Sequence, residues 1–277
     1  MKCAWQELLS ILPDWMRRDV DELGRETLQE LRLRCGQAPI LRCHRKEHAL
    51  VKPIVKEDIH YIVNTASRYS PWSASTTAQG YITAPGGHRI GICGEAVVQD
   101  GNMSAIRYPT SLCIRIARDF PGIAMRVGQL SGSILMIGPP GTGKTTLLRD
   151  LVRQRAKREI VCVVDERGEI YPNGFYRGEN VDVLTGVNKQ QGIERLLRVM
   201  SPSTIAVDEI TSELDCNAMK NAGWCGVDIL ATAHAANMED LRTRPIYRPI
   251  VQTGMFANII VLNPDKSWHL ERMSACT

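Results

Sequence analysis

Residues 138–145 read GPPGTGKT, a complete phosphate-binding loop of the form G-x-x-x-x-G-K-[ST]. The loop follows an apolar run at 134–137 and precedes a run with helical spacing at 145–158. It therefore lies between a predicted strand and a predicted helix, where backbone N–H groups and the helix N-terminus can bind an anionic phosphate. Glycines are needed because the loop turns tightly and its backbone must approach the ligand closely. This context predicts a nucleoside triphosphate site.

Individual positions of the loop have expected roles. Lys144 would reach the β- and γ-phosphates, and the Thr145 hydroxyl would bind Mg²⁺. The chain has no N-K-x-D guanine signature, so ATP with Mg²⁺ is the expected ligand pair. The residues predicted to bind the nucleotide are Gly138, Pro139, Pro140, Gly141, Thr142, Gly143, Lys144, Thr145 and Thr146.

Composition narrows the class of protein. With 44% hydrophobic and 23% charged residues among 277, the chain resembles a soluble globular protein with an ample core. Residues 1–125 carry 16 basic and 13 acidic residues, and the remainder carries 18 and 17. This balance does not favour direct binding of nucleic acid. Nine cysteines without a C-x-x-C pair indicate reduced thiols in the cytosol.

The first half of the chain predicts an α+β domain over residues 1–120. A helix is expected at 5–12, two short strands around a turn at 36–37, and an amphipathic helix at 57–69. A hairpin with its turn at 85–87 and a further strand at 111–117 complete this half.

The second half predicts an α/β domain over residues 121–277, after a joint rich in Pro and Gly at 119–122. Apolar strands alternate with helical segments, which is typical of a largely parallel sheet covered on both faces. The six expected strands are 133–138, 159–165, 181–185, 204–209, 227–234 and 257–263. No apolar run approaches the ~20 residues of a membrane-spanning helix, so we expect any membrane association to depend on partners.

Hydrolysis requires more than a phosphate loop, because a metal-side carboxylate and a group that orients water are also needed. The strand at 204–209 ends in Asp208 and Glu209, at the edge where α/β sheets place ligands. Asp208 would hold Mg²⁺ and Glu209 would polarise the attacking water. The alternative is a strand that ends in a solvated acidic turn, but the upstream phosphate loop favours catalysis.

Two further strands end in polar side chains. Asp165 and Glu166 follow an apolar strand and either position the metal and its water or form an exposed loop that pairs with Arg167. His234 ends another strand, where it either senses the γ-phosphate or is structural. Both readings remain open for each strand.

The γ-phosphoryl group usually needs an arginine in the transition state, often from a neighbouring subunit. Arg89, Arg107 and Arg115 lie on or beside predicted strands of the first half and are the candidates. Surface arginines are common, so each of the three can also be an ordinary surface residue without a role in catalysis.

The order of these elements resembles the secretion-ATPase superfamily, which includes the motors of type II and type IV secretion and of type IV pili. Those proteins carry a phosphate loop, an acidic box, a Walker B strand and a histidine box. The stretches MSPSTIAVDE at 200–209 and ATAHA at 231–235 are the most specific. Together with segments from about Leu28 to Asn263, they are similar to the stage III sporulation protein AA family.

This resemblance implies a RecA-like P-loop ATPase domain with a smaller N-terminal α+β domain, active as a homo-hexamer. Asp165 and Glu166 would form the acidic box, with Asp165 near the metal, and His234 the histidine box. Arg89, Arg107 and Arg115 would face a neighbour's nucleotide. The family also implies endospore formation, in the mother-cell cytoplasm, at the membrane-embedded components of a channel to the forespore.

Two other functions fit part of the pattern. A nucleotide-dependent nucleic-acid motor or loader would share the RecA-like ring, but the near-neutral halves and only 15 aromatic residues oppose it. A nucleotide-binding scaffold without turnover is opposed by the intact Asp208 and Glu209.

Overall fold

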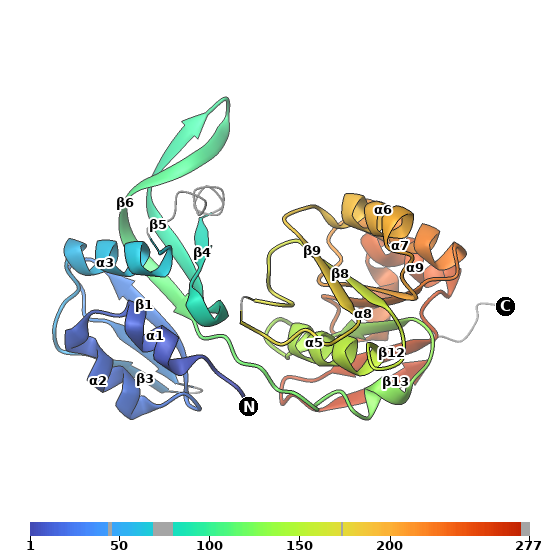
Figure 1. The fold of residues 1–277 in the computed structure, drawn as a ribbon, viewed down its shortest axis with the longest axis horizontal. Helices are drawn as coiled ribbons and strands as arrows, with labels where there is room; N and C mark the ends of the chain where they lie inside the picture. The colour runs from blue at the N-terminus through green and yellow to red at the C-terminus, as the bar shows by residue number, and fades with distance from the viewer. Residues whose placement is uncertain (44–45, 69–79, 173, 273–277) are drawn as a thin grey trace. The chain divides into compact units, whose positions relative to one another are not determined.

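The computed structural model describes residues 1–43, 46–68, 80–172 and 174–272. The chain divides into two compact units, drawn as ribbons in Figure 1. The first unit contains Met1–Asp119 and Pro172–Phe175, and the second contains Phe120–Tyr171 and Tyr176–Thr277. No helix within the described ranges is long and apolar enough to cross a membrane.

The first unit is a six-stranded antiparallel sheet with order β3-β2-β1-β6-β5-β4 and helices on one face. Side chains alternate along its strands, so that Leu31 and its register partners Leu41 and Ile114 are fully buried while their neighbours are not. Its elements are α1 (Trp5–Ile11), α2 (Asp14–Leu23), β1 (Leu28–Arg34), β2 (Ile40–Cys43), β3 (Lys46–Ala49), α3 (Lys56–Ala66), β4 (Tyr81–Thr83), β5 (Arg89–Gln99) and β6 (Asn102–Arg115).

The expected elements of this half are present, and α2 and β3 are additional ones that the sequence analysis did not predict. Two of the expected elements also differ in length. The amphipathic helix ends at Ala66, earlier than predicted, and Tyr69 lies outside the described residues. Strand β6 is much longer than the predicted strand, and with β5 it forms a two-stranded arm that protrudes from the sheet in Figure 1. The arm begins at Gly94, where the register shifts and a Cβ atom would lie 2.8 Å from two carbonyl oxygens of β6.

The second unit is a seven-stranded sheet with order β13-β12-β7-β11-β10-β8-β9, in which only the β12–β13 pair is antiparallel. All six predicted strands are present, and β13 is an additional one. The elements are β7 (Ile134–Ile137), α5 (Lys144–Arg155), β8 (Val161–Asp165), β9 (Val181–Thr185), α6 (Lys189–Val199), β10 (Thr204–Val207), α7 (Glu213–Trp224), β11 (Asp228–Ala233), α8 (Met238–Thr243), α9 (Arg248–Thr253), β12 (Asn258–Leu262) and β13 (Trp268–Arg272).

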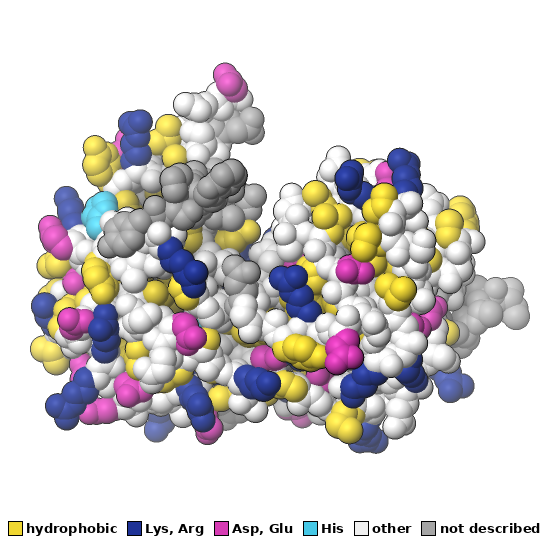
Figure 2. Space-filling view, in the orientation of Figure 1, with side chains coloured by type: hydrophobic (Ala, Val, Ile, Leu, Met, Phe, Trp, Pro, Cys, Tyr) yellow, Lys and Arg dark blue, Asp and Glu magenta, His cyan; other side chains and the backbone are white. Residues whose placement is uncertain are grey.

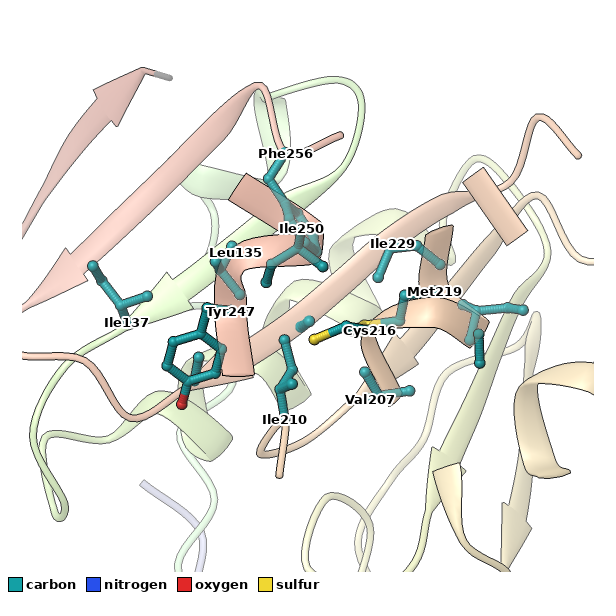
Figure 3. Packing of buried hydrophobic residues seen from close by; sticks show 14 of the residues in the cluster. Leu135, Ile137, Val207, Ile210, Cys216, Met219, Ile229, Tyr247, Ile250 and Phe256 are labelled. Atoms are coloured by element: carbon teal, nitrogen blue, oxygen red, sulfur yellow. The ribbon is translucent and has the colours of Figure 1, made fainter. Parts of the chain in front are cut away.

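Both faces of the central strands are buried, which explains their continuous apolar character. Leu135 and Val207 point into a core formed with α6, α7 and α9, part of which Figure 3 shows. The alternate residues Met136 and Ala206 are equally buried on the opposite face, where α5 packs against β7 and β11. This packing fixes the carboxyl ends of β8, β10 and β11 beside one another, as expected for a ligand site.

Candidate nucleotide-binding site

The phosphate loop connects the last residue of β7, Ile137, to the first residue of α5, Lys144. Gly141 and Gly143 adopt φ angles of 78° and 99°, in the left-handed region that favours glycine. A Cβ atom at Gly138 would lie 2.6 Å from the Leu262 carbonyl oxygen, so the close approach to β12 also requires glycine. The predicted strand–loop–helix arrangement is therefore present.

Lys144 is turned back onto its own loop. Its Nζ atom donates hydrogen bonds to the carbonyl oxygens of Gly138 at 2.7 Å and Pro139 at 2.9 Å, and lies 3.2 Å from His234 Nδ1. Burial lowers the pKa of Lys144, while the negative charges of Asp208 and Glu209 act in the opposite direction. The ammonium group therefore has partners in the loop that a phosphate could replace.

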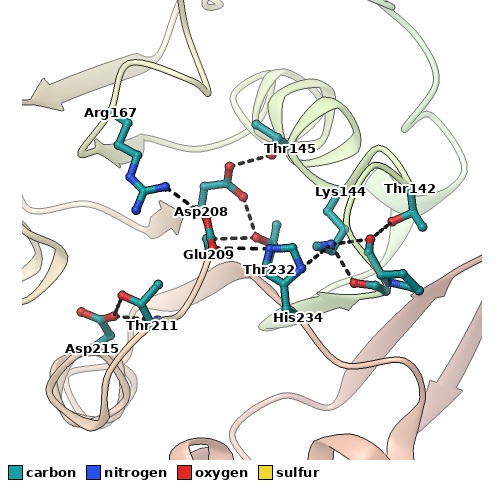
Figure 4. Close-up of polar contacts among 12 residues, drawn as sticks. Thr142, Lys144, Thr145, Arg167, Asp208, Glu209, Thr211, Asp215, Thr232 and His234 are labelled. Carbon is teal, nitrogen blue, oxygen red and sulfur yellow. Dashed lines mark hydrogen bonds and ion pairs between the residues drawn. The ribbon is translucent and has the colours of Figure 1, made fainter. Parts of the chain in front are cut away.

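Asp208 is held by two hydroxyl groups, as Figure 4 shows. Thr145 Oγ1 donates to Asp208 Oδ2 at 2.6 Å, and Thr232 Oγ1 donates to Asp208 Oδ1 at 2.5 Å. Thr232 is fully buried on β11 and also accepts a hydrogen bond from the backbone N–H of Glu209 at 2.8 Å. This one hydroxyl thus fixes both acidic residues at the end of β10.

Glu209 has an unusual backbone and two basic neighbours. Its φ angle of 54° lies in the left-handed region, which is uncommon for a residue other than glycine. Its Oε1 atom lies 3.4 Å from His234 Nε2, and its Oε2 atom lies 3.5 Å from Arg167 Nη1. His234 therefore lies between the ammonium of Lys144 and the carboxylate of Glu209 (Figure 4).

Asp165 is 2% exposed and accepts hydrogen bonds from the chain that follows it. Its Oδ1 atom accepts from the N–H groups of Glu169 and Ile170, and its Oδ2 atom accepts from that of Tyr171. Burial raises the pKa of Asp165, and the hydrogen bonds from Tyr171 and Ile170 oppose this rise. Both carboxylate oxygens are engaged by the backbone, so a metal role for Asp165 stays a prediction that these bonds do not support.

Glu166 pairs with a residue that the sequence did not single out. Its Oε2 atom lies 2.6 Å from Nζ of Lys189, a 5% exposed residue at the start of α6. The alternative interpretation pairs this acidic loop with Arg167. In the structure, Arg167 instead contacts Glu209. Together these groups line a pocket formed by Val164, Asp165, Glu166, Arg167, Glu169, Lys189, Asp208 and Glu209.

The donor set fits a magnesium ion shared with a nucleotide. No group of three or more His, Cys, Asp and Glu side chains that could hold a metal ion occurs within the described ranges. Mg²⁺, however, usually binds one or two protein oxygens, several waters and the substrate phosphates. Thr145 at the start of α5 and Asp208 after β10 have adjacent oxygens, and these provide such a pair.

The three candidate arginines belong to the first unit, where two of them are neighbours and the third lies apart. Arg89 on β5 and Arg115 on β6 are directly opposite in register, whereas Arg107 is opposite Glu95 on the arm. Like charges directly opposite one another destabilise a strand pair. Arg89 stacks on the Tyr81 ring at 4.1 Å, and Arg115 lies 3.9 Å from Glu30.

The family model "Sporulation stage III, protein AA" matches residues 4–269. The chain belongs to this family. Stage III sporulation protein AA of Bacillus subtilis (strain 168) is 33% identical over 282 residues, which is 94% of this chain and 91% of that protein.

Two solved structures share the fold of the family member described here. The ATPase DotB of Legionella pneumophila has a TM-score of 0.62 at 15% identity, covering 94% of this chain and 80% of that one. The pilus retraction motor PilT with bound ADP has a TM-score of 0.62 at 13% identity, covering 94% and 82%. The mixed α/β fold is thus similar to that of the ATPase DotB and of the pilus retraction motor PilT.

Proposed function

We propose that this protein is a Mg²⁺-dependent ATPase whose RecA-like second unit powers or assembles a membrane-associated channel complex during endospore formation. The observation that carries the proposal is the joining of the phosphate loop to the acidic end of β10 through the Thr145–Asp208 hydrogen bond. Strand β11 separates the loop strand β7 from β10 and places Thr232, and His234 directly after the strand, at the same edge. The family supports the role in sporulation.

Each side chain has a distinct task in this proposal. The loop amides and Lys144 bind the triphosphate, and Glu209 orients a water and accepts its proton as the water oxygen attacks the γ-phosphorus. The bond from that phosphorus to the bridging oxygen breaks, which yields ADP and inorganic phosphate. Thr145 and Asp208 would hold Mg²⁺, which when bound neutralises charge on the phosphates.

We further propose a homo-hexamer in the mother-cell cytoplasm, docked on membrane-embedded channel components. Arg89 and Arg115, which lie opposite one another in the sheet, are candidates to contact a neighbour's γ-phosphate, because an arginine from a neighbouring subunit often stabilises the charge of phosphoryl transfer. Arg107, on the arm, is a separate candidate for the same contact.

Phosphate release by purified protein tests the enzyme assignment. Lys144→Ala should lose nucleotide binding, and Glu209→Gln should keep binding but lower turnover by about 10²-fold or more, as expected for loss of a general base. Lys157→Ala, at an exposed lysine that contacts Gln154, is the matched control. Wild-type rates in both site variants would overturn the assignment.

The same assay tests the ring, since an arginine supplied in trans requires contact between subunits. Turnover per subunit should fall on dilution in parallel with oligomeric mass. Turnover that stays constant while the mass falls to that of a monomer would refute the trans arrangement.

The alternative of a nucleic-acid motor has less support. On the face shown in Figure 2, Lys and Arg side chains are interspersed with Asp and Glu rather than gathered in a stripe. A strong, salt-sensitive stimulation of turnover by single-stranded DNA or RNA would favour that alternative.

A further inference from the structure

Arg167 lies on a loop that is anchored independently of any ligand. The carboxylate of Asp165 binds three backbone N–H groups within residues 169–171. Arg149, which is 5% exposed, donates from the other side to the carbonyl oxygens of Glu169 and Ile170. The backbone that carries Arg167 is therefore held at one end by these two side chains and at the other end by its continuation from β8.

This anchoring directs the Arg167 guanidinium to Glu209, which ends the neighbouring strand. Strands β8 and β10 are parallel partners, with Val164 opposite Val207. Arg167 Nη1 reaches Glu209 Oε2 at 3.5 Å, although the two residues are far apart in sequence. Figure 4 shows Arg167 and His234 on opposite sides of the Glu209 carboxylate.

Both carboxylate oxygens of Glu209 are thus engaged, but the two contacts differ in what can change them. Because a charged ammonium only donates, the contact from Lys144 makes His234 Nδ1 an acceptor and places the ring proton on Nε2, toward Glu209 Oε1. A bound γ-phosphate that draws Lys144 away would alter the contact between His234 and Glu209. The contact between Arg167 and Glu209 has no such link to the phosphate loop.

We propose that Arg167 is a positioning residue that restrains Glu209 and thereby limits turnover. The inference rests on the proposed ATPase function and adds to it a contact within the same subunit that lowers the rate of hydrolysis. In the ion pair, the guanidinium takes one lone-pair direction of Glu209 Oε2 and holds the carboxylate toward the loop after β8. Glu209 is then less free to align a water beside the γ-phosphate, and loosening the pair adds to the barrier of hydrolysis.

The expected effect is modest because the two side chains are 50% and 35% exposed. Pairs with this exposure are weak and are screened by salt. Arg167→Gln should raise kcat about two- to five-fold, equivalent to roughly 0.4 to 1 kcal/mol at 1.36 kcal/mol per factor of ten. Nucleotide affinity should not change, because the loop and Lys144 remain intact.

The experiment measures kcat and nucleotide Kd for the full chain at saturating Mg²⁺ and ATP, at low and high salt. Raising salt should increase kcat of the wild type and leave Arg167→Gln unchanged, whereas Arg167→Lys should restore part of the restraint. The exposed Arg195 on α6 provides the control Arg195→Gln, which should behave as wild type. Equal melting temperatures would exclude an effect through folding.

A kcat of Arg167→Gln that is equal to or below that of the wild type would overturn the inference. A large decrease would instead make Arg167 a group that assists the reaction. Failure of the proposed ATPase function would give a different result, because Glu209→Gln would then retain full turnover. If Glu209→Gln is inactive and Arg167→Gln is not accelerated, only the restraint is refuted.

Discussion

Replacement of Thr232 by valine tests how the acidic end of β10 is held. Valine keeps the shape of the side chain and removes the hydroxyl that donates to Asp208 and accepts from the Glu209 N–H. A hydrogen bond to a charged acceptor contributes about 1.5–3 kcal/mol and a neutral one about 0.5–1.5 kcal/mol. Asp208 and Glu209 are partly exposed, so water compensates some of this loss. We therefore expect Thr232→Val to lower the free energy of unfolding by about 1–3 kcal/mol.

Urea unfolding, followed by circular dichroism, measures this change. With a slope of about 2 kcal/mol per molar urea, the midpoint of the second unit should fall by roughly 0.5–1.5 M. Turnover should fall about 10- to 100-fold, because Asp208 loses one of the two groups that orient it. Thr232→Ser keeps the hydroxyl and should retain most of the rate. A Thr232→Val protein with the stability and turnover of the wild type would show that the hydroxyl does not support this site.

Two further predictions concern the first unit. Burial lowers the pKa of His88, whose Nε2 contacts the Ala4 carbonyl oxygen at 2.8 Å and whose Nδ1 accepts from the Ala117 N–H. Because the folded-state pKa lies below the ordinary value of about 6.5, neutral His88 contributes stability above that pH, and this contribution is lost as pH falls below it. Urea midpoints at pH 7 and pH 5 should therefore diverge more for the wild type than for His88→Asn, and equal divergence would contradict the assignment. Gly94→Ala should destabilise the unit by about 1–3 kcal/mol, since its Cβ would meet two backbone oxygens at 2.8 Å. Gly91→Ala, whose nearest neighbours are at 3.8 Å, is its control, and similar melting temperatures for both variants would refute the argument.

The strands of the second unit could be predicted because burial on both faces leaves a continuous apolar run. The exception is β13, where Trp268–Arg272 is partly exposed and mostly polar. It is an antiparallel edge strand, paired only with β12, so its sequence lacks the signal that identified the others. In the β5–β6 arm only the β6 strand was predicted too short, although the Asp100-Gly101 pair between Gln99 and Asn102 is a signal for a two-residue hairpin turn.

In the site, local motifs predicted the backbone positions but not the side-chain partners. The phosphate loop and Asp208 lie as expected because strand ends and helix starts place them directly. The contacts of Glu209 with Arg167 and of Glu166 with Lys189 join residues 42 and 23 positions apart, respectively. Such pairs depend on which strands are neighbours and on how the following loop turns, and neither is encoded in a short motif.

The two acidic strand ends show why similar motifs can be used differently. Because Val164 is opposite Val207, Asp165 at the end of β8 and Asp208 directly after β10 lie at the same edge of two adjacent parallel strands. Burial raises the pKa of Asp165, as does the charge of Asp208, although to a smaller extent. For Asp165, hydrogen bonds from backbone N–H groups and the charge of Arg149 oppose this rise in pKa. Asp208 instead accepts hydrogen bonds from the hydroxyl groups of Thr145 and Thr232. Hydroxyl donors can rotate away and leave a carboxylate free for a cation, but a folded backbone cannot do so without unfolding its loop. The division between a carboxylate that shapes the site and one that can bind a metal therefore follows from the donors that each one receives.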